Sequence, residues 1–196
     1  MSRQLLRLTR DRTAFLCCDI QSVFQETIYR FPHVVHTASV LVSAAKILNI
    51  PVVVSEQYPE KLGHTVADID LTRAHVYSKT KFSMITPDFP TSILRDTDAF
   101  VLFGIEAHVC VQQTALDLLE AGKSVVLVTD GVSSSRELDR STAIQRLTNA
   151  GVVLMTAEAI MFEIMRTKEC SEFKTISGLA KQLAIFGKSG GSLSSL

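Results

Sequence analysis

The sequence predicts an α/β protein with a doubly wound, three-layer architecture around a six-stranded, mostly parallel sheet. Short apolar segments alternate with segments in which apolar residues recur at helical spacing, as strand–helix units do. The short segments are apolar throughout, which is typical of parallel strands buried on both faces. The 196 residues are enough for one domain with a full core.

Each expected strand is a continuous apolar run, and the runs lie at 13–18, 51–54, 74–77, 99–103, 124–128 and 152–155. Helices are expected over 34–48, 108–121, 138–149, 158–166 and 172–183. Gly122 and Gly151 follow two of these segments, at the position where glycine often ends a helix. Right-handed crossovers between parallel strands would place helices on both faces, in a Rossmann-like arrangement.

The chain is expected to form a single domain over residues 1–186, because no linker or internal repeat interrupts the alternation. Residues 187–196 are rich in serine and glycine, so a flexible tail is expected there. The final Ser194-Ser195-Leu196 is a weak match to a peroxisomal address, because its middle residue is not basic.

The composition argues against several classes of partner. Twenty basic residues balance twenty acidic ones, so the basic excess typical of proteins that bind nucleic acids or membrane surfaces is missing. No apolar run reaches the roughly 20 residues of a membrane span. The four cysteines show no C-x-x-C or zinc-finger spacing, so free thiols in the cytoplasm are expected.

Three reactive side chains lie at predicted strand ends. Asp19 ends the first strand, Lys79 follows the third, and Cys110 lies in the turn after the fourth. Ligands of open parallel sheets bind beyond the carboxyl ends of the strands. An aspartate there is often only a turn former, and a lysine is often only a solvated surface residue. The joint placement of a carboxylate, an ammonium and a thiol favours a catalytic site.

The setting of Cys110 favours a nucleophile. A thiol at the start of a helix lies at the positive end of the helix dipole, which stabilises the thiolate. The first-turn N–H groups lack intrahelical partners and could bind an oxyanion. One segment could therefore supply both a nucleophile and an oxyanion hole.

The motifs around these residues resemble those of the isochorismatase-like cysteine hydrolases, which include nicotinamidases and N-carbamoylsarcosine amidases. The resemblance covers residues 13–183 and is strongest to the isochorismatase domain-containing subgroup. The motifs are Asp19-Ile-Gln21, Lys79-x-Lys-Phe-Ser83, Gly104-Ile-Glu-Ala-His-Val-Cys110 and Asp130-Gly-Val-x-Ser-Ser-Arg136.

The resemblance implies an isochorismatase-like hydrolase fold and a Cys-Asp-Lys triad that cleaves a C–N bond through a thioester. Cys110 would be the nucleophile, Asp19 the general base and acid, and Lys79 their charge partner. The N–H groups of Glu106 and Cys110 would form the oxyanion hole, after a cis peptide between Ile105 and Glu106. A small-molecule amide or related acyl substrate and a homo-oligomer are implied as well.

Five further residues are candidates to line the substrate pocket: Gln21, Phe24, Gln57, Tyr58 and His108. His108 could equally be a structural hydrogen-bonding residue. Asp130 and Arg136 are expected to form a turn and an ion pair instead of contacting substrate.

No metal or cofactor is expected. Nicotinamidases carry an Asp-x-His and a later histidine beside the pocket, whereas the matching loop here is Ser55-Glu56-Gln57-Tyr58, followed by His64. One histidine is a poor zinc site. Two alternatives to amide hydrolysis stay open: acid-promoted vinyl ether hydrolysis by Asp19, and a non-catalytic binding or scaffold role.

Overall fold

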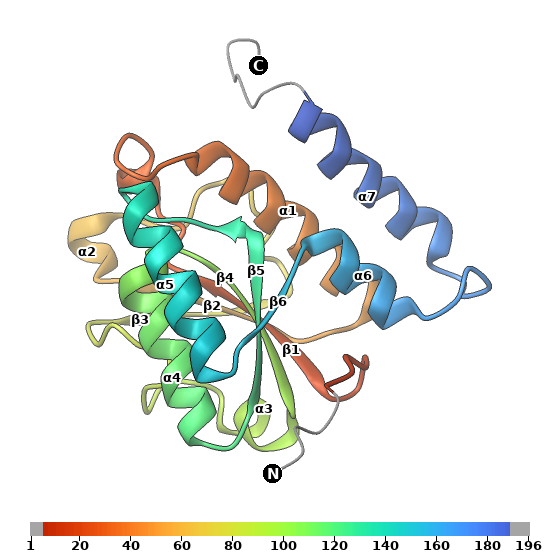
Figure 1. Cartoon of the computed structure of the whole chain (residues 1–196), viewed down its shortest axis with the longest axis horizontal. Helices are drawn as coiled ribbons and strands as arrows, with labels where there is room; N and C mark the ends of the chain where they lie inside the picture. Colours follow the sequence, from red (N-terminus) through yellow and green to blue (C-terminus); the bar gives the residue numbers. More distant parts are fainter. Residues whose placement is uncertain (1–5, 189–196) are drawn as a thin grey trace.

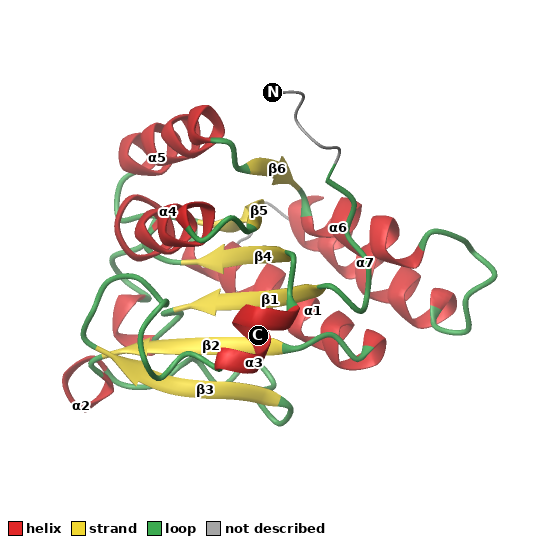
Figure 2. Cartoon of the chain, turned by 90° about the horizontal axis from the view of Figure 1, so that it is seen from below, coloured by secondary structure: helices red, strands yellow, loops and turns green. Residues whose placement is uncertain are grey.

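The computed structural model describes residues 6–188, and in it six strands form one sheet with the order β3-β2-β1-β4-β5-β6. Every pair of neighbouring strands is parallel. Figure 2 shows the strands side by side in this order. The predicted α/β class and doubly wound topology are confirmed. The strands are β1 (Thr13–Cys18), β2 (Val52–Gln57), β3 (Ala74–Lys79), β4 (Ala99–Gly104), β5 (Ser124–Val132) and β6 (Val153–Met155).

Helices cover both faces of the sheet (Figure 1). One face packs against α1 (Phe31–Leu48), α6 (Ala157–Met165) and α7 (Phe173–Lys188). The other packs against α3 (Thr91–Asp96), α4 (Gln112–Glu120) and α5 (Glu137–Ala150). The short α2 (Pro59–Leu62) follows β2. The tail predicted from residue 187 begins inside α7, and residues 189–196 lie outside the described part.

The helix α1 is long and apolar enough to cross a membrane by composition, with a mean hydropathy of 1.3 over 18 residues. More than half of it, 56%, is buried inside the molecule. Its apolar side chains, such as Val34, Ala38 and Leu41, belong to the core between the sheet and α7. We therefore interpret α1 as a core helix of this domain.

Several elements differ from the sequence prediction. β2 continues to Gln57, because residues 55–57 pair with β3 up to the Gln57–Lys79 register, so this segment is not a loop. β5 likewise continues to Val132, and the short helices α2 and α3 were not expected. The predicted 108–121 helix is divided into a π-helical turn, Ala107–Val111, and α4. The turn forms because the Val111 N–H reaches five residues back to the Glu106 carbonyl, at 3.2 Å.

The position of the site follows from the strand order. From β1 the chain continues to β2 and β3 on one side of the sheet, and it then crosses to β4 on the other side of β1 and continues to β5 and β6. Ligands of open parallel sheets bind at the switch point where the strand order reverses, which here lies between β1 and β4. Gly104 ends β4 with φ of 122°, and a Cβ there would lie 2.1 Å from the Cys18 carbonyl oxygen. Only glycine fits so close a backbone contact. The close contact at Gly104 brings the turn that follows β4 against the end of β1.

Candidate active site

Asp19 lies directly after β1, in the left-handed backbone region with φ of 51°. Its side chain is buried, and both carboxylate oxygens accept hydrogen bonds. Ser55 Oγ donates to Oδ1 at 2.7 Å, and Lys79 Nζ donates to Oδ2 at 2.7 Å. These contacts fix the carboxylate at the junction of β1, β2 and β3.

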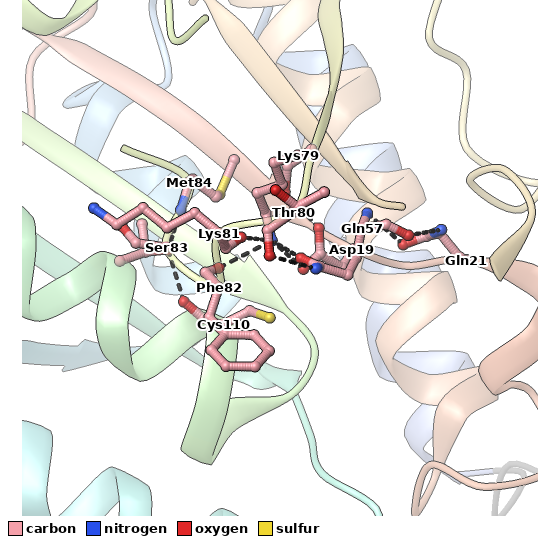
Figure 3. Close-up of polar contacts among 12 residues, drawn as sticks. Asp19, Gln21, Gln57, Lys79, Thr80, Lys81, Phe82, Ser83, Met84 and Cys110 are labelled. Atoms are coloured by element: carbon pink, nitrogen blue, oxygen red, sulfur yellow. Dashed lines mark hydrogen bonds and ion pairs between the residues drawn. The ribbon is translucent and has the colours of Figure 1, made fainter. Parts of the chain in front are cut away.

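Lys79 ends β3, and its side chain is 0% exposed. Figure 3 shows its ammonium group directed toward Asp19 and Gln57. Nζ donates to Gln57 Oε1 at 2.7 Å and to the carbonyl oxygens of Phe82 at 2.9 Å and Lys81 at 3.3 Å. The ammonium is therefore surrounded by protein acceptors.

The charge of Lys79 is stabilised by its surroundings. Burial by itself lowers the pKa of Lys79, but attraction to the acidic groups of Cys18, Asp19 and Cys110 outweighs it and raises the pKa. A buried ion pair with this many hydrogen bonds keeps the lysine charged and the aspartate oriented.

Cys110 lies in the π-helical turn, and the residue is only 7% exposed. Thr114 Oγ1 donates to the Cys110 carbonyl at 2.7 Å and accepts from the Met84 N–H at 2.9 Å. These bonds join the cysteine turn to the loop that follows β3. Upstream of the turn, the Ile105–Glu106 peptide bond is cis. Within residues 6–188, the Glu106 N–H has no hydrogen-bond acceptor.

The remaining cysteines lie in other environments. Cys17 and Cys18 are fully buried in β1, and burial raises the pKa of both thiols. Cys170 is partly exposed and lies between α6 and α7. Cys110 is the cysteine that borders the cavity at the switch point.

This cavity has a volume of about 210 Å³ and opens at the carboxyl ends of the strands. Asp19 and Cys110 both face it. Its lining consists of Asp19, Phe24, Gln57, Leu62, Phe82, Ile105, Glu106, Val109 and Cys110. A carboxylate and a thiol thus share one small compartment, and the Lys79 ammonium lies behind the carboxylate.

The predicted pocket residues divide into two groups. Phe24 and Gln57 line the cavity, whereas Gln21, Tyr58 and His108 are not among its lining residues. Gln21 is fully buried and bonds the main chain of Gln57 and of the glycine that follows α2. Tyr58 adopts a left-handed conformation at the start of α2, outside the cavity lining.

His108 makes polar contacts through both ring nitrogens and is outside the cavity lining. Its Nδ1 lies 3.0 Å from Ser134 Oγ, and its Nε2 lies 3.3 Å from Glu106 Oε2. The expected ion pair of Arg136 forms with Asp139, at 2.6 Å. The Asp130 carboxylate accepts the first N–H of α6, from Ala157 at 2.9 Å.

Sequence reasoning missed the residues that hold or enclose the reactive groups. Ser55 is opposite Cys18 in the β1–β2 register, and its position at a central strand end was the available signal. Leu62, Phe82 and Val109 line the cavity from a short helix, a loop and the π-helical turn. Their apolar character gave no signal, because apolar residues at such places usually belong to the core.

Glu56 and His64 form a pair between the end of β2 and the loop after α2. Glu56 accepts hydrogen bonds from the N–H and Oγ1 of Thr65, at 2.7 and 2.9 Å, and lies 2.8 Å from His64 Nδ1. In the described part of the chain, no three His, Cys, Asp or Glu side chains are grouped to bind a metal ion. The pair fastens the loop after α2 to the end of β2.

Comparison with known proteins assigns the family. The Isochorismatase domain model matches residues 13–159, a range that contains Asp19, Lys79 and Cys110. This chain therefore belongs to the isochorismatase family, a class of hydrolases. Among its relatives, isochorismatase domain-containing protein 1 of Salmo salar is 43% identical over 175 residues. The alignment covers 88% of this chain and 62% of that protein, so the chain spans about three-fifths of its relative.

Two solved structures illustrate the fold. A structure described as MAR1 ribonuclease from Caenorhabditis elegans has a TM-score of 0.85 and 38% identity, covering 89% of this chain and 92% of that one. The Escherichia coli YcaC gene product, described as an octameric hydrolase of unknown specificity, has a TM-score of 0.78 and 20% identity. That match covers 98% of this chain and 100% of the other, and it shows a shared fold.

Proposed function

We propose that this protein is a metal-independent cysteine hydrolase that cleaves small amides or related acyl compounds with Cys110, Asp19 and Lys79. The observation that carries the proposal is the placement of Asp19 and Cys110 on one 210 Å³ cavity, with Lys79 bonded to the carboxylate at 2.7 Å. The family is a hydrolase family, and this arrangement supplies a nucleophile, a base and a charge partner.

The proposed reaction begins with transfer of the Cys110 thiol proton to Asp19. The sulfur attacks the carbonyl carbon, and the N–H groups of Glu106 and Cys110 stabilise the resulting oxyanion. Asp19 then gives its proton to the leaving nitrogen, the C–N bond breaks, and a thioester stays on Cys110. Water, deprotonated by Asp19, attacks the thioester and releases the acid and the thiol. Lys79 stabilises the negative charge in the steps in which Asp19 is ionised.

Two other functions use the same residues differently. In vinyl ether hydrolysis, Asp19 would protonate the substrate and Cys110 would be dispensable. In a binding or scaffold protein, neither residue would be needed for the role. The buried and fully bonded Lys79–Asp19 pair favours an enzyme, because an ion pair in this setting orients a carboxylate toward the cavity.

The test is a screen of small amides and carbamoyl compounds with the wild type and with Cys110→Ala. We expect Cys110→Ala to lower kcat by at least about 10³-fold, because it removes the nucleophile. Cys170→Ala, which changes a thiol outside the cavity lining, is the matched control and should retain activity. Mass spectrometry should also detect an acyl adduct on Cys110. Full activity of Cys110→Ala would instead support Asp19-promoted ether hydrolysis.

We further propose that the protein acts in a reducing compartment such as the cytoplasm and forms a homo-oligomer. Four free cysteines support the first proposal. The second is supported by the shared fold with the octameric E. coli hydrolase and by exposed apolar side chains such as Leu138, which is 70% exposed. Light scattering of the purified full chain measures the assembly.

A further inference from the structure

The cavity beside Cys110 is apolar over most of its wall. The side chains beyond the reactive pair comprise five apolar residues and two polar ones. The apolar ones are Phe24, Leu62, Phe82, Ile105 and Val109. The volume of about 210 Å³ lies below the roughly 300–1,000 Å³ of pockets for drug-sized ligands. The cavity therefore fits a compact molecule with an apolar substituent.

The charges at this cavity are negative or already paired. Within residues 6–188, no lysine or arginine lines it. The Lys79 ammonium is bonded to four protein acceptors behind the wall and has 0% exposure. Lys81 is directed elsewhere, to Asp117 Oδ2 at 2.8 Å. No positive charge is therefore available to an anionic group that enters the cavity.

Glu106 adds a negative group to this wall. Glu106 is one of the residues that line the cavity, and its side chain is 27% exposed, so it is neither fully buried nor fully screened by water. His108 Nε2 lies 3.3 Å from Oε2 and offsets the charge only when the imidazole is protonated. An entering carboxylate would lose water, find no unpaired cation and meet the negative charge of the Glu106 side chain, since the Asp19 charge is already paired with Lys79.

We propose that this site selects uncharged acyl compounds with a compact apolar substituent and rejects substrates that carry a carboxylate, and that Glu106 is the residue that enforces this selection. The class of substrate rests on the proposed hydrolase function. The acyl carbon would lie beside Cys110, and its substituent would contact Phe24, Leu62 and Phe82. Selection against charge is a property of the cavity itself and can be measured without turnover.

A matched pair of alkylating agents measures this property directly. Iodoacetamide and iodoacetate each form an S–C bond with a thiolate and release iodide, and they differ in charge. Rates at Cys110 and Cys170 in the full chain would be followed at pH 8 by peptide mass spectrometry. The preference at each cysteine is the ratio of its rate with iodoacetamide to its rate with iodoacetate. We expect this ratio to be at least about 50-fold higher at Cys110 than at Cys170, because the anion must enter the cavity without a counter-ion.

Variants assign the preference to Glu106. Glu106→Gln keeps the main-chain N–H and should reduce the preference at least about fivefold, because it removes one facing charge. Glu120→Gln, an exposed acid on α4, is the control and should leave the preference unchanged. Equal preference at Cys110 and Cys170, or no change in Glu106→Gln, overturns the proposal. A Cys110 that reacts with neither reagent also overturns it, because the cavity would then be closed.

Turnover of two amides of equal size tests the substrate class. 4-Methylpentanamide and succinamate differ by an isopropyl group in place of a carboxylate. We expect kcat/KM to be at least about 100-fold higher for the neutral amide. Equal values overturn the charge selection. If neither amide is cleaved but the alkylation preference holds, the charge selection stands and the proposed amide hydrolysis fails.

Discussion

Lys79 and Lys81 are two residues apart in the sequence, yet they have different environments. Lys79 is fully buried against Asp19, whereas the Lys81 side chain is 54% exposed and pairs with Asp117. Exposed ion pairs contribute little to stability, while a buried charge that loses its partner is costly. The two lysines therefore allow a matched test of the ion pair.

We predict that Lys79→Met lowers the free energy of unfolding by about 3–5 kcal/mol, because it leaves the Asp19 charge buried without its partner. Activity should fall at least about 100-fold, since the orientation of the acid–base group is lost. Lys81→Met should change the unfolding free energy by less than about 1 kcal/mol. Urea denaturation and steady-state kinetics measure both. Equal effects of the two substitutions would show that the ion pair has no special role.

At the scale of elements, the site depends on loops that hydrogen bonds fasten to strand ends. Glu56, near the end of β2, bonds Thr65 and His64 beyond α2, and Leu62 of α2 lines the cavity. Burial by itself raises the pKa of Glu56, but the hydrogen bonds from Thr65 and His64 outweigh it and lower the pKa. The ionised carboxylate therefore stabilises the observed position of this loop.

The lowered pKa predicts how stability depends on pH. Since the folded-state value lies below the unfolded value of about 4.3, the contribution of Glu56 is present above that pH. It is lost as the pH falls through the folded-state pKa. At pH 7 we expect Glu56→Gln to lower the free energy of unfolding by about 1–3 kcal/mol, because charge-assisted hydrogen bonds are replaced.

The measurement is urea denaturation of the wild type and Glu56→Gln between pH 3 and 7. The difference in the free energy of unfolding between the wild type and Glu56→Gln should shrink as the pH falls below about 4.3. Glu60→Gln, an exposed acid on α2, is the control and should match the wild type within about 0.5 kcal/mol. A difference that stays constant down to pH 3 would mean that the charge of Glu56 does not stabilise the fold.

At the scale of the whole molecule, the six strands, the doubly wound class and both helical layers could be predicted from the alternation of apolar runs and helical periodicity. Asp19, Lys79 and Cys110 could be placed at one edge because their positions follow directly from strand ends. The cavity wall could not be predicted from the sequence, since Leu62 and Phe82 lie on short connections whose course depends on tertiary contacts. The hydrogen bonds of Gln21 to the backbone could not be predicted either, because a polar side chain near a site can equally bond the main chain.

The two layers share one sheet, so we predict that they unfold together. Cys17 belongs to the core beneath α1 and Cys18 to the core beneath α4, although the two residues are adjacent in β1. Burial raises the pKa of each thiol, so both should resist alkylation in the native state, whereas the partly exposed Cys170 should react.

Pulsed alkylation across a urea series, read by peptide fragmentation between Cys17 and Cys18, tests this prediction. Both thiols should become reactive at the same urea concentration, which should coincide with the loss of helical circular dichroism. Labelling of Cys17 at lower urea would show that the layer of α1, α6 and α7 separates first. Because Asp19 directly follows these two cysteines in the chain, such early loosening of β1 would also reach the Asp19 carboxylate before the rest of the sheet unfolds.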